Sequence, residues 1–373
     1  MLVQWGVNWH LREFFQSNCG KPKKAASSKQ TNRVGATASD IHMALGWPDL
    51  PQFPTHDRMP DMILNPHVSV QIDLPQIWRN AESIAKSVPV PMIAVVKADA
   101  YGLGARQVAG AINDVVDAFY VFDAAEAVEY DLFHLTGKRT IALTGRSDDA
   151  ADYIRHRIHP AVWTLERAAL LKDARPVLSV DCGQQRFGCP LHEVADFTHR
   201  TGINEIFTHA ITAEQALRFD ELTRKIPGSF RHAAGSALLK DSRTWFDAVR
   251  PGMALYQGAM RVSTALIEAR ESHGPAGYTG FTTSHHGVIR CGYSNGLRPG
   301  ACIVNGSARR IVEVGMQSAF VELGAKDRVG DEVILLGDGL TESDVATQWK
   351  CTPQEALMRL SGAGVRSYNR TGL

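Results

Sequence analysis

The chain has 373 residues, of which 44% are hydrophobic and 21% are charged, and its formal net charge at pH 7 is +1. This length allows two domains, and the near-zero charge provides no strong field that would attract nucleic acid or an anionic membrane surface. No apolar run in the sequence approaches the ~20 residues that a membrane-spanning helix needs. We therefore expect neither a nucleic-acid partner nor a membrane partner.

The six cysteines are scattered along the chain, without a Cys-x-x-Cys pair or a zinc-binding spacing. This pattern is typical of reduced thiols, so we expect a cytoplasmic protein with no metal site. No internal repeat is seen at the periods of solenoid proteins.

Residues 1–66 differ in composition and periodicity from the rest of the chain. Residues 1–15 are aromatic and mildly amphipathic, residues 21–37 are rich in Lys, Ser, Ala and Thr, and residues 48–66 carry prolines with little periodicity. They lack the charged, apolar and small-residue pattern of a signal peptide. We expect an N-terminal extension that is poorly ordered; a targeting segment, an oligomer contact and mis-assigned upstream sequence are the alternatives.

From His67 onward, apolar runs alternate with helical patterns. Residues 68–73 alternate as a strand, and residues 74–88 have the spacing of an amphipathic helix. Strands that alternate with helices form parallel sheets, so we predict a (β/α)8 barrel over residues 67–271. Further buried strands are expected at 93–97, 118–122, 140–144, 176–180 and 205–209.

After residue 271 the pattern changes to short alternating runs broken by glycines, which is typical of an all-β domain. One further helix is expected at about 341–360. The predicted fold is therefore α/β, a TIM-like (β/α)8 barrel followed by a smaller C-terminal β domain over residues 272–373. The expected strands of this domain are 287–291, 301–304, 311–314, 319–323 and 332–337.

Residues 93–104 combine a buried strand with a lysine, Lys97, at its end and a glycine-containing turn after it. In (β/α)8 barrels the catalytic groups lie at the carboxyl ends of the strands. A lysine with apolar walls there can lose its proton and attack an aldehyde to form a Schiff base. On this pattern alone, a solvated lysine at a strand end is the alternative.

The sequence of residues 95–104, Val-Val-Lys-Ala-Asp-Ala-Tyr-Gly-Leu-Gly, closely resembles the signature of the alanine racemases, which are two-domain pyridoxal-phosphate (PLP) enzymes. The resemblance spans about 67–373. It implies that Lys97 carries the cofactor and serves as one base, and that Tyr101 contacts the cofactor phosphate.

Residues 291–296, Cys-Gly-Tyr-Ser-Asn-Gly, are similar to the family's Gly-Tyr-Ala-Asp-Gly turn, with Asn295 in place of the aspartate. The resemblance implies that Tyr293 is the second base and reaches the barrel of another subunit, which requires a homodimer. A free tyrosine has a pKa of ~10, so it needs nearby cationic or donor groups to act near neutrality. A structural tyrosine in a turn is the alternative.

Residues 249–256, Val-Arg-Pro-Gly-Met-Ala-Leu-Tyr, look like the family's Val-Arg-x-Gly-x-x-x-Tyr segment. The resemblance implies that Arg250 faces the pyridine nitrogen of the cofactor, where a permanently charged guanidinium makes the ring a weaker electron sink. It further implies that the phosphate is bound by Ser236 and by the backbone amides near Gly252 and Met253. A loop arginine at the surface and a helix-capping serine are the alternatives.

Residues 180–188 resemble the family's Val-Asp-Thr-Gly-x-x-Arg-x-Gly, with a cysteine for the threonine. The resemblance implies that Arg186 bonds the phenolic oxygen of PLP and lies near the substrate carboxylate. Ser179 stands where the family often has a lysine that orients this arginine, so we expect Arg186 to be held differently. His209 matches a histidine of the cofactor site that bonds the second-base tyrosine; a core histidine is the alternative.

Two segments near the C-terminus depart from the family pattern. Met316 stands where a backbone group touches the substrate, but Gln317 replaces the aspartate that commonly follows. Residues 360–366 align with a segment that often supplies a tyrosine near the phosphate, and none is present at that register, since Tyr368 is displaced. We expect a more open pocket or a less tightly held phosphate.

The resemblance implies an isomerase that interconverts L- and D-alanine with Lys97 and Tyr293 as opposed bases, and that supplies D-alanine for peptidoglycan. The changes at 294–297 and 361–366 leave open a racemase of wider specificity, for serine or basic amino acids. A non-catalytic PLP-binding homologue is a further alternative. Fold-related decarboxylases are disfavoured, because their Gly-Gly-Gly phosphate loop is not found.

Overall fold

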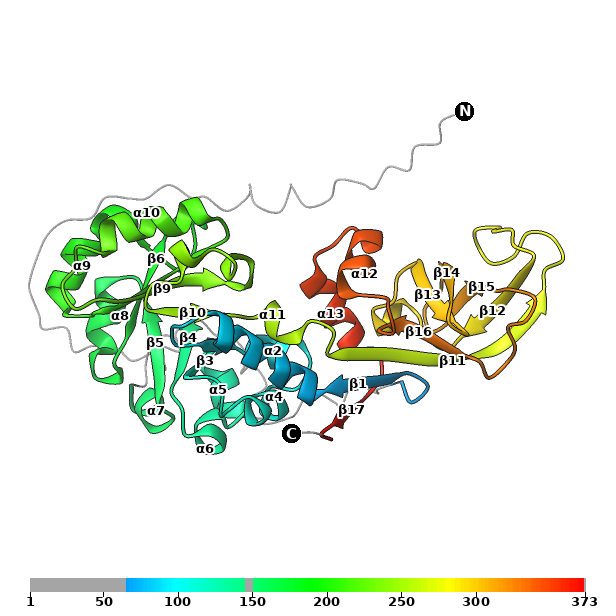
Figure 1. Ribbon diagram of the computed structural model, residues 1–373, viewed down its shortest axis with the longest axis horizontal. Coiled ribbons are helices and arrows are strands. Elements are labelled where there is room, and N and C mark those ends of the chain that lie inside the picture. Colours follow the sequence, from blue (N-terminus) through cyan, green and yellow to red (C-terminus); the bar gives the residue numbers. More distant parts are fainter. Residues whose placement is uncertain (1–64, 145–149, 372–373) are drawn as a thin grey trace, which may run out of the picture. The chain divides into compact units, whose positions relative to one another are not determined.

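The computed structural model describes residues 65–144 and 150–371 (Figure 1). The expectation of a poorly ordered extension concerns residues 1–66, of which 1–64 lie outside the described residues. Within the described ranges the fold is α/β, a parallel barrel followed by a smaller and mostly antiparallel β domain. The predicted fold class is confirmed.

Within the described residues, eight parallel strands form the barrel in the order β2-β3-β4-β5-β6-β8-β9-β10, and a short strand, β7, pairs with β6. A parallel bridge between Met92 and Val249 joins the first strand to the last. The strands are β2 (Ile93–Val95), β3 (Ala118–Asp123), β4 (Thr140–Thr144), β5 (Ile158–Val162), β6 (Val177–Asp181), β7 (Cys189–Pro190), β8 (Glu205–Ala210), β9 (Phe230–Gly235) and β10 (Ala248–Arg250).

Helices connect the strands and cover the outside of the barrel (Figure 1). Asp73, Thr164 and Thr212 cap the first turns of α2, α8 and α10 by accepting hydrogen bonds from backbone N–H groups. The helices are α2 (Leu74–Ser87), α3 (Lys97–Tyr101), α4 (Ala105–Ala111), α5 (Ala124–Glu129), α6 (Leu132–Thr136), α7 (Ala150–Arg155), α8 (Leu165–Leu170), α9 (Val194–Thr201), α10 (Ala213–Thr223) and α11 (Met253–Tyr256), with 3-10 turns at Lys172–Ala174, Leu191–Glu193, Ser236–Leu238 and Ser242–Thr244.

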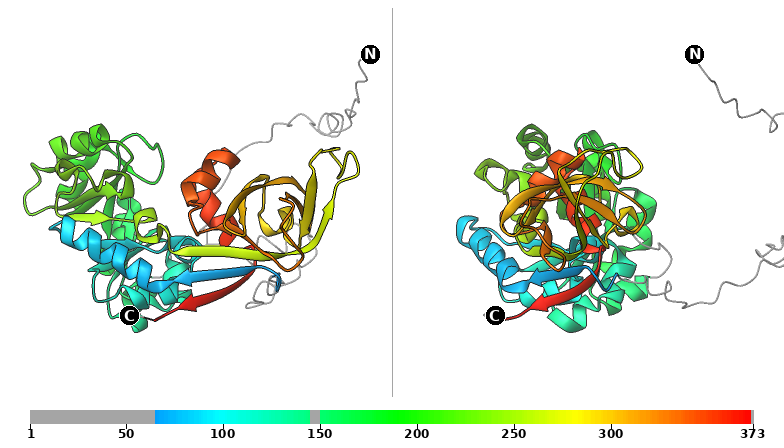
Figure 2. Two further views of the ribbon diagram at one scale, coloured as in Figure 1. Left: turned by 45° about the vertical axis from the view of Figure 1, so that its right-hand side comes forward. Right: turned by 90° about the vertical axis from the view of Figure 1, so that its right-hand side faces the viewer.

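A second sheet forms the core of the β domain, with the strand order β12-β15-β14-β13-β16-β11-β1-β17 among the described residues. Its last strand, β17, pairs in parallel with β1, and β1 pairs antiparallel with β11 (Figure 2). The strands are β1 (Ser69–Asp73), β11 (Met260–Glu271), β12 (His285–Ile289), β13 (Gly300–Val304), β14 (Ser307–Val314), β15 (Ala319–Glu322), β16 (Glu332–Leu336) and β17 (Val365–Asn369), and a 3-10 turn spans Tyr293–Asn295.

Strands β1 and β11 lie in the segment 67–271 that the sequence analysis assigns to the barrel, yet both belong to this second sheet. The burial of β1 gives the reason, because Val70 and Ile72 are buried while Gln71 between them is exposed. A strand of a closed parallel barrel is covered on both faces and is apolar throughout, whereas alternation indicates a sheet with one solvated face. The domain boundaries themselves stay a prediction.

The single helix expected at about 341–360 is two helices, α12 (Glu342–Trp349) and α13 (Pro353–Ser361). Lys350 adopts a left-handed conformation with a φ of 53° and ends the first helix. Thr352 then caps the second by accepting from the N–H of Glu355, and Pro353 occupies its first turn. Proline fits the first turn of a helix but not its interior, so the break follows from this residue.

The inside of the barrel holds an apolar cluster of its own, separate from the main core. The inner cluster consists of Ile93, Val95, Ala118, Tyr120, Ile141, Ala161, Val177, Phe207 and Ala248.

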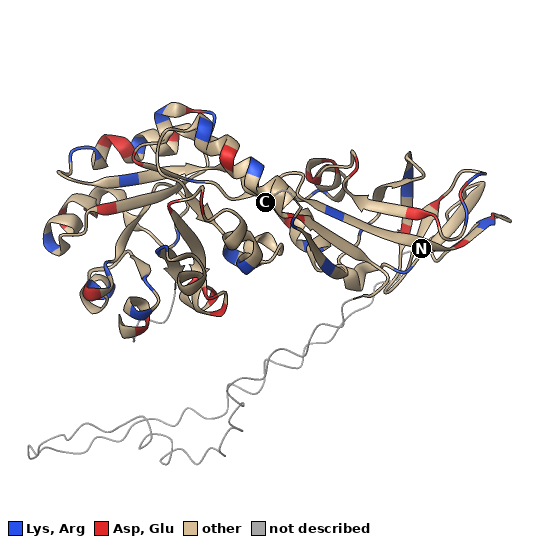
Figure 3. Ribbon diagram, turned by 60° about the horizontal axis from the view of Figure 1, so that its bottom comes forward, with Lys and Arg blue, Asp and Glu red and all other residues tan. Residues whose placement is uncertain are grey.

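Basic and acidic side chains are interspersed over the helices (Figure 3), as the near-zero net charge suggests. Among the described residues, none of the helices has the length and apolarity needed to cross a bilayer.

Candidate active site

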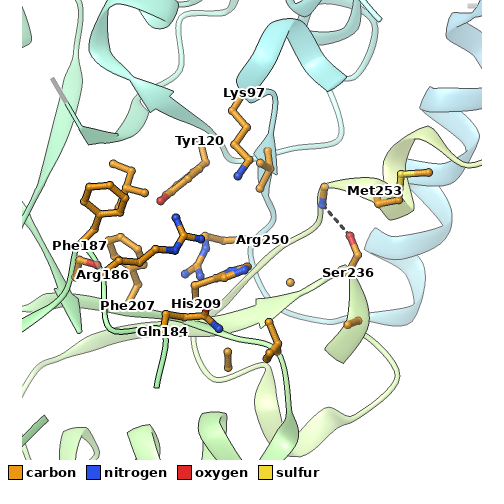
Figure 4. A pocket seen from close by; sticks show the side chains of 18 of the residues that line it. Lys97, Tyr120, Gln184, Arg186, Phe187, Phe207, His209, Ser236, Arg250 and Met253 are labelled. Atoms are coloured by element: carbon orange, nitrogen blue, oxygen red, sulfur yellow. Dashed lines mark hydrogen bonds between the residues drawn. The ribbon is translucent and has the colours of Figure 1, made fainter. Parts of the chain in front are cut away.

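A cavity of about 240 Å³ opens at the carboxyl ends of the barrel strands (Figure 4). Ser236 and Met253 lie at one side of it, and Arg186 and Phe187 lie at the opposite side. The structure brings together around this cavity all eight residues that the sequence analysis assigns to cofactor binding, although their roles stay a prediction. They are Lys97, Tyr101, Arg186, His209, Ser236, Arg250, Gly252 and Met253.

Lys97 lies two residues after the end of β2, and its side chain points into the cavity (Figure 4). Burial is the main reason why the pKa of Lys97 lies below its usual value, and the positive charges of Arg186 and Arg250 lower it further. Glu126 acts in the opposite direction. A lowered pKa increases the share of neutral amine near pH 7, which is the nucleophilic form.

The residues after Lys97 form a left-handed turn; we call residues 97–104 the Lys97 turn. Ala98, Asp99, Ala100 and Tyr101 have φ values of 53°, 54°, 52° and 58°. A left-handed conformation costs a residue with a side chain about 1–2 kcal/mol, so neighbouring groups must stabilise this run.

Three side chains bond the backbone of the Lys97 turn and of the residue after it. The N–H of Ala98 donates to Glu126 Oε1 at 2.8 Å, and the N–H of Asp99 donates to Tyr130 Oη at 3.1 Å. Asp99 Oδ1 accepts from the N–H of Ala105 at 2.8 Å. These bonds hold the turn that presents the lysine.

Ser236 and Gly252 shape the side of the cavity opposite Arg186. Ser236 Oγ accepts from the N–H of Gly252 at 2.9 Å and from the N–H of Ala254 at 3.1 Å. A Cβ atom at Gly252 would collide with the hydroxyl of Tyr101. The absence of a side chain therefore lets a hydroxyl, a tyrosine and backbone amides gather where an anionic group can bind.

Arg250 is buried, with 5% of its surface exposed, below the cavity. Its Nη1 donates to the carbonyl oxygen of His232 at 3.0 Å and also contacts His232 Nδ1, and its Nη2 donates to the carbonyl oxygen of Thr208 at 2.5 Å. The guanidinium carbon lies 4.8 Å from the ring centroid of Phe207. Burial lowers the pKa of Arg250 to about 10, so the guanidinium stays charged at neutral pH.

A chain of polar side chains continues from Arg250 through the inside of the barrel. His232 Nε2 lies 3.2 Å from Glu205 Oε1. The two oxygens of Glu205 accept from Arg139 at 2.6 and 2.9 Å, and Arg139 Nη1 lies 3.3 Å from His159 Nδ1. Sequence reasoning missed Glu205 and Arg139, whose only signal is a charge at the start of an otherwise apolar strand.

The pKa values of the side chains in this polar series show which of them are charged. Burial lowers the pKa of His232 to about 4, although Glu205 acts against it. Burial alone would raise the pKa of Glu205, but hydrogen bonds from His232 and Arg139 outweigh it and lower the value to about 2. A neutral His232 can therefore accept from Arg250 at Nδ1 and donate to the carboxylate at Nε2.

His209 and Arg186 complete the polar wall. Desolvation, followed by the charges of Arg250, Lys97 and Arg186, lowers the pKa of His209 to about 4, so its imidazole is neutral. Arg186 lies in the loop after β6, where Asp181 Oδ1 accepts from two backbone N–H groups. Ser179 borders the same cavity.

Tyr293 lies in the 3-10 turn after β12 and Met316 lies between β14 and β15, and neither lines the cavity. Both side chains are exposed, at 57% and 62% respectively. Their loops are tied together, because the N–H of Tyr293 donates to Gly315 and Ser294 Oγ donates to the carbonyl oxygen of Met316 at 2.7 Å. Within one chain, the structure does not bring Tyr293 to Lys97.

The C-terminal segment adds one residue that the sequence analysis missed. Gln354, in the first turn of α13, lines the cavity. Tyr368 is not among the lining residues, and its hydroxyl lies against Gly104 instead.

Among the described residues, no three His, Cys, Asp or Glu side chains form a group that could hold a metal ion.

The fold and the cavity together define the class of protein, a (β/α)8-barrel enzyme with a β domain whose site gathers a lysine amine and two guanidinium groups. A family model described as the alanine racemase N-terminal domain matches residues 72–259, and one described as the alanine racemase C-terminal domain matches residues 261–368. The chain belongs to the alanine racemase family, and is thus an isomerase. The resemblance seen in the sequence is confirmed.

Curated relatives and solved structures agree with this assignment. The biosynthetic alanine racemase of Escherichia coli strain K12 is 30% identical, over 80% of this chain and 98% of that protein. The crystal structure of the biosynthetic alanine racemase from Pseudomonas aeruginosa has a TM-score of 0.75 at 24% identity, over 82% of this chain and all of that one. A Bartonella henselae alanine racemase with covalently bound pyridoxal phosphate has a TM-score of 0.73 at 24% identity, with the same coverage. The two structures support the fold.

The first prediction concerns Glu205. We expect Glu205→Gln to lower the free energy of unfolding at pH 7 by about 2–4 kcal/mol, because it leaves the Arg139 charge uncompensated inside the barrel. The pKa of Glu205 in the folded protein, about 2, lies below the usual ~4.3 of an unfolded chain. The difference between wild type and variant is therefore full above pH ~5 and shrinks as the pH falls below that value.

Urea denaturation across this pH range measures the effect. Glu82→Gln is the control, since Glu82 pairs with Lys86 on the outer face of α2, where we expect a change of at most ~1 kcal/mol. Equal effects of the two substitutions would contradict a buried charge network.

The second prediction concerns Gly252. We expect Gly252→Ala to destabilise the protein by about 1–3 kcal/mol, because the new methyl group displaces the ring of Tyr101. Gly110→Ala is the matched control: this helical glycine has no atom within 4 Å of a built Cβ, so the change should be neutral or stabilising by ~0.5–1 kcal/mol. Thermal unfolding of both variants measures the difference, and a neutral Gly252→Ala would show that the packing is not tight.

Proposed function

We propose that this protein is a PLP-dependent racemase that interconverts L- and D-alanine. The observation that carries the proposal is the cavity itself, in which the Lys97 amine with its lowered pKa lies between the hydroxyl and amides around Ser236 and the buried charge of Arg250. The names of the curated relatives support alanine as the substrate. The lysine, the anion-binding side and the fixed cation are the groups that racemisation with this cofactor requires.

The residues present fit PLP. The amine of Lys97 suits the aldehyde, and Tyr101, Ser236 and the amide of Met253 suit the phosphate. The amide of Gly252, which donates to Ser236 Oγ in this structure, would lie beside them. When bound, the cofactor supplies an electron-withdrawing ring that makes the Cα–H of an amino acid acidic. The Bartonella henselae relative with covalently bound PLP supports this assignment.

Arg250 would face the ring nitrogen and donate a hydrogen bond to it. Its pKa of about 10 and its bonds to the carbonyl oxygens of His232 and Thr208 keep the proton on the guanidinium. Arg186, on the far side of the cavity, would bind the phenolic oxygen of the cofactor and the substrate carboxylate, for which a forked donor is suited.

Racemisation by two bases needs a group on each face of the substrate Cα. Lys97 would hold and move the proton on one face. Tyr293 would act on the other from a second copy of the chain, since its ring is exposed and its turn is held by backbone bonds. Met316, beside it, would bring its backbone to the substrate. The proposal therefore includes a homodimer with two shared sites.

D-Alanine made in this way would enter peptidoglycan in a bacterial cytoplasm. The description of several relatives as biosynthetic alanine racemases supports that role. We further propose that residues 1–66 form an extension and that the barrel and the β domain divide at the start of β11, near residue 260, rather than at 271.

A racemase of wider specificity is the second candidate. Gln354 borders the cavity, and residues 360–366 lack the tyrosine that the family often places near the phosphate. The missing tyrosine favours a pocket that admits a longer side chain than a methyl group, and the amide of Gln354 would bond a polar one. Initial rates with a panel of L-amino acids separate the two candidates, because a faster rate with serine or lysine than with alanine favours the second.

The third prediction tests racemisation directly. We expect the purified protein with PLP to exchange the Cα hydrogen of L-alanine with D2O and to form D-alanine, with turnover in the ~1–1,000 s⁻¹ range of ordinary enzymes. Proton NMR follows the loss of the Cα signal, and Lys97→Arg should abolish it. A cofactor absorbance band without exchange on any common amino acid would instead indicate a non-catalytic homologue.

The fourth prediction tests the shared site. We expect Lys97→Ala and Tyr293→Phe homodimers to be nearly inactive, whereas a refolded mixture regains about a quarter of wild-type activity, because half of the dimers then contain one complete site of two. Tyr278→Phe, at an exposed tyrosine of the same domain, is the control and should keep full activity. A mixture as inactive as its parents would argue against a tyrosine donated by the partner.

A further inference from the structure

The Lys97 turn is in contact with the last strand of the chain. Arg366, on β17, donates from Nη1 to Asp99 Oδ2 at 2.6 Å and to the carbonyl oxygen of Gly102 at 2.9 Å. The two residues are separated by 267 positions in the sequence. One guanidinium therefore bonds both a side chain and the backbone of the turn that presents the lysine.

Two further contacts join the same parts. A Cβ at Gly102 would collide with Ser361 at the end of α13, and one at Gly104 would collide with the hydroxyl of Tyr368 on β17. Arg366 and Tyr368 are two residues apart on a strand, so their side chains lie on one face, toward the turn. The glycines allow the turn to pack directly against the C-terminal segment.

The placement of Arg366 depends on its strand. β17 is the edge strand of the second sheet and pairs in parallel with β1, with Arg366 opposite Val70. β1 pairs on its other side with β11. The arginine is thus carried by a strand that is not part of the strained turn, and it can hold that turn from outside.

Asp99 is the receiving group, and it serves two contacts at once. Its Oδ1 accepts from the N–H of Ala105 and its Oδ2 accepts from Arg366. Asp99 itself has a positive φ, as do its neighbours. Loss of the guanidinium would leave the carboxylate and the Gly102 carbonyl without this donor, and the left-handed run would relax toward commoner conformations.

We propose that Arg366 is a positioning residue, which holds the Lys97 turn through Asp99 and Gly102 and thereby fixes the direction in which Lys97 enters the cavity. Arg366 does not line the cavity, so it acts only through the turn. Its consequence for cofactor retention rests on the proposed function, whereas its effect on the turn does not.

The fifth prediction tests this role by hydrogen–deuterium exchange and cofactor release in the full-length protein. We expect Arg366→Ala to speed amide exchange in peptides covering residues 97–105 about 3- to 10-fold, the range for a charged hydrogen bond that is one-third exposed. PLP should leave the variant faster by a similar factor. Arg366→Lys should recover part of both effects, since an ammonium can also donate to both acceptors but is carried on a side chain that is one bond shorter and lacks the planar guanidinium.

A double-mutant comparison separates positioning from a general loss of stability. Asp99→Asn keeps an acceptor for Ala105 but weakens the bond to Arg366, so Asp99→Asn and Arg366→Ala together should speed exchange less than the product of their separate effects. Arg359→Ala is the control, because Arg359 is similarly exposed and pairs with Glu355 on α13. It should leave exchange at residues 97–105 unchanged.

The outcomes distinguish this inference from the proposed function. Normal exchange at residues 97–105 in Arg366→Ala, or fully multiplicative effects in the double variant, would overturn the positioning role. If wild type fails to bind PLP, the proposed function is wrong, while the exchange data still decide whether Arg366 holds the turn.

Discussion

The barrel buries a guanidinium that keeps its charge at neutral pH, and much of the site follows from this constraint. Arg250 is bonded to backbone carbonyls and to a neutral His232, and it stacks near the ring of Phe207. The carboxylate of Glu205 lies on the other side of His232 and pairs directly with Arg139. Because a buried charge without compensation is strongly destabilising, the polar chain that ends at Arg139 is part of the site although it lies beneath it.

The same charge acts on the groups around the cavity. The pKa of Lys97 is lowered first by burial and then by Arg186 and Arg250, and the pKa of His209 is lowered in the same way. A lysine must be neutral to act as a nucleophile or base, and a neighbouring cation favours that form without taking up the proton itself. The fixed arginines therefore favour the neutral amine of the lysine, and they also make the cavity favourable for an anionic ligand.

The sequence predicted the fold class and the groups around the cavity because the family resemblance lies in the loops that follow the barrel strands. It missed β5 and β9, since His159, Arg231 and His232 interrupt the apolar runs by which barrel strands are recognised. It also missed β10, which has only three residues. It also counted β1 with the barrel, although the alternation of Val70 and Ile72 with Gln71 indicated a half-solvated sheet. Contacts such as Glu205 with Arg139 join residues 66 positions apart and leave no local pattern to read.

The glycines of the Lys97 turn and of the Arg250 segment show why these motifs are specific although the sequence alone does not reveal the reason for each residue. Gly252 is small because Tyr101 lies against it, and Gly102 and Gly104 are small because Ser361 and Tyr368 do. Each of these three glycines is therefore explained by a contact with a residue that is distant in the sequence. Local propensity cannot supply these reasons, since four left-handed residues in succession are unfavourable in isolation. The turn is held both by Glu126 and Tyr130 of the barrel and by the C-terminal segment that packs on it, so the lysine that the barrel presents is positioned in part by residues outside the barrel.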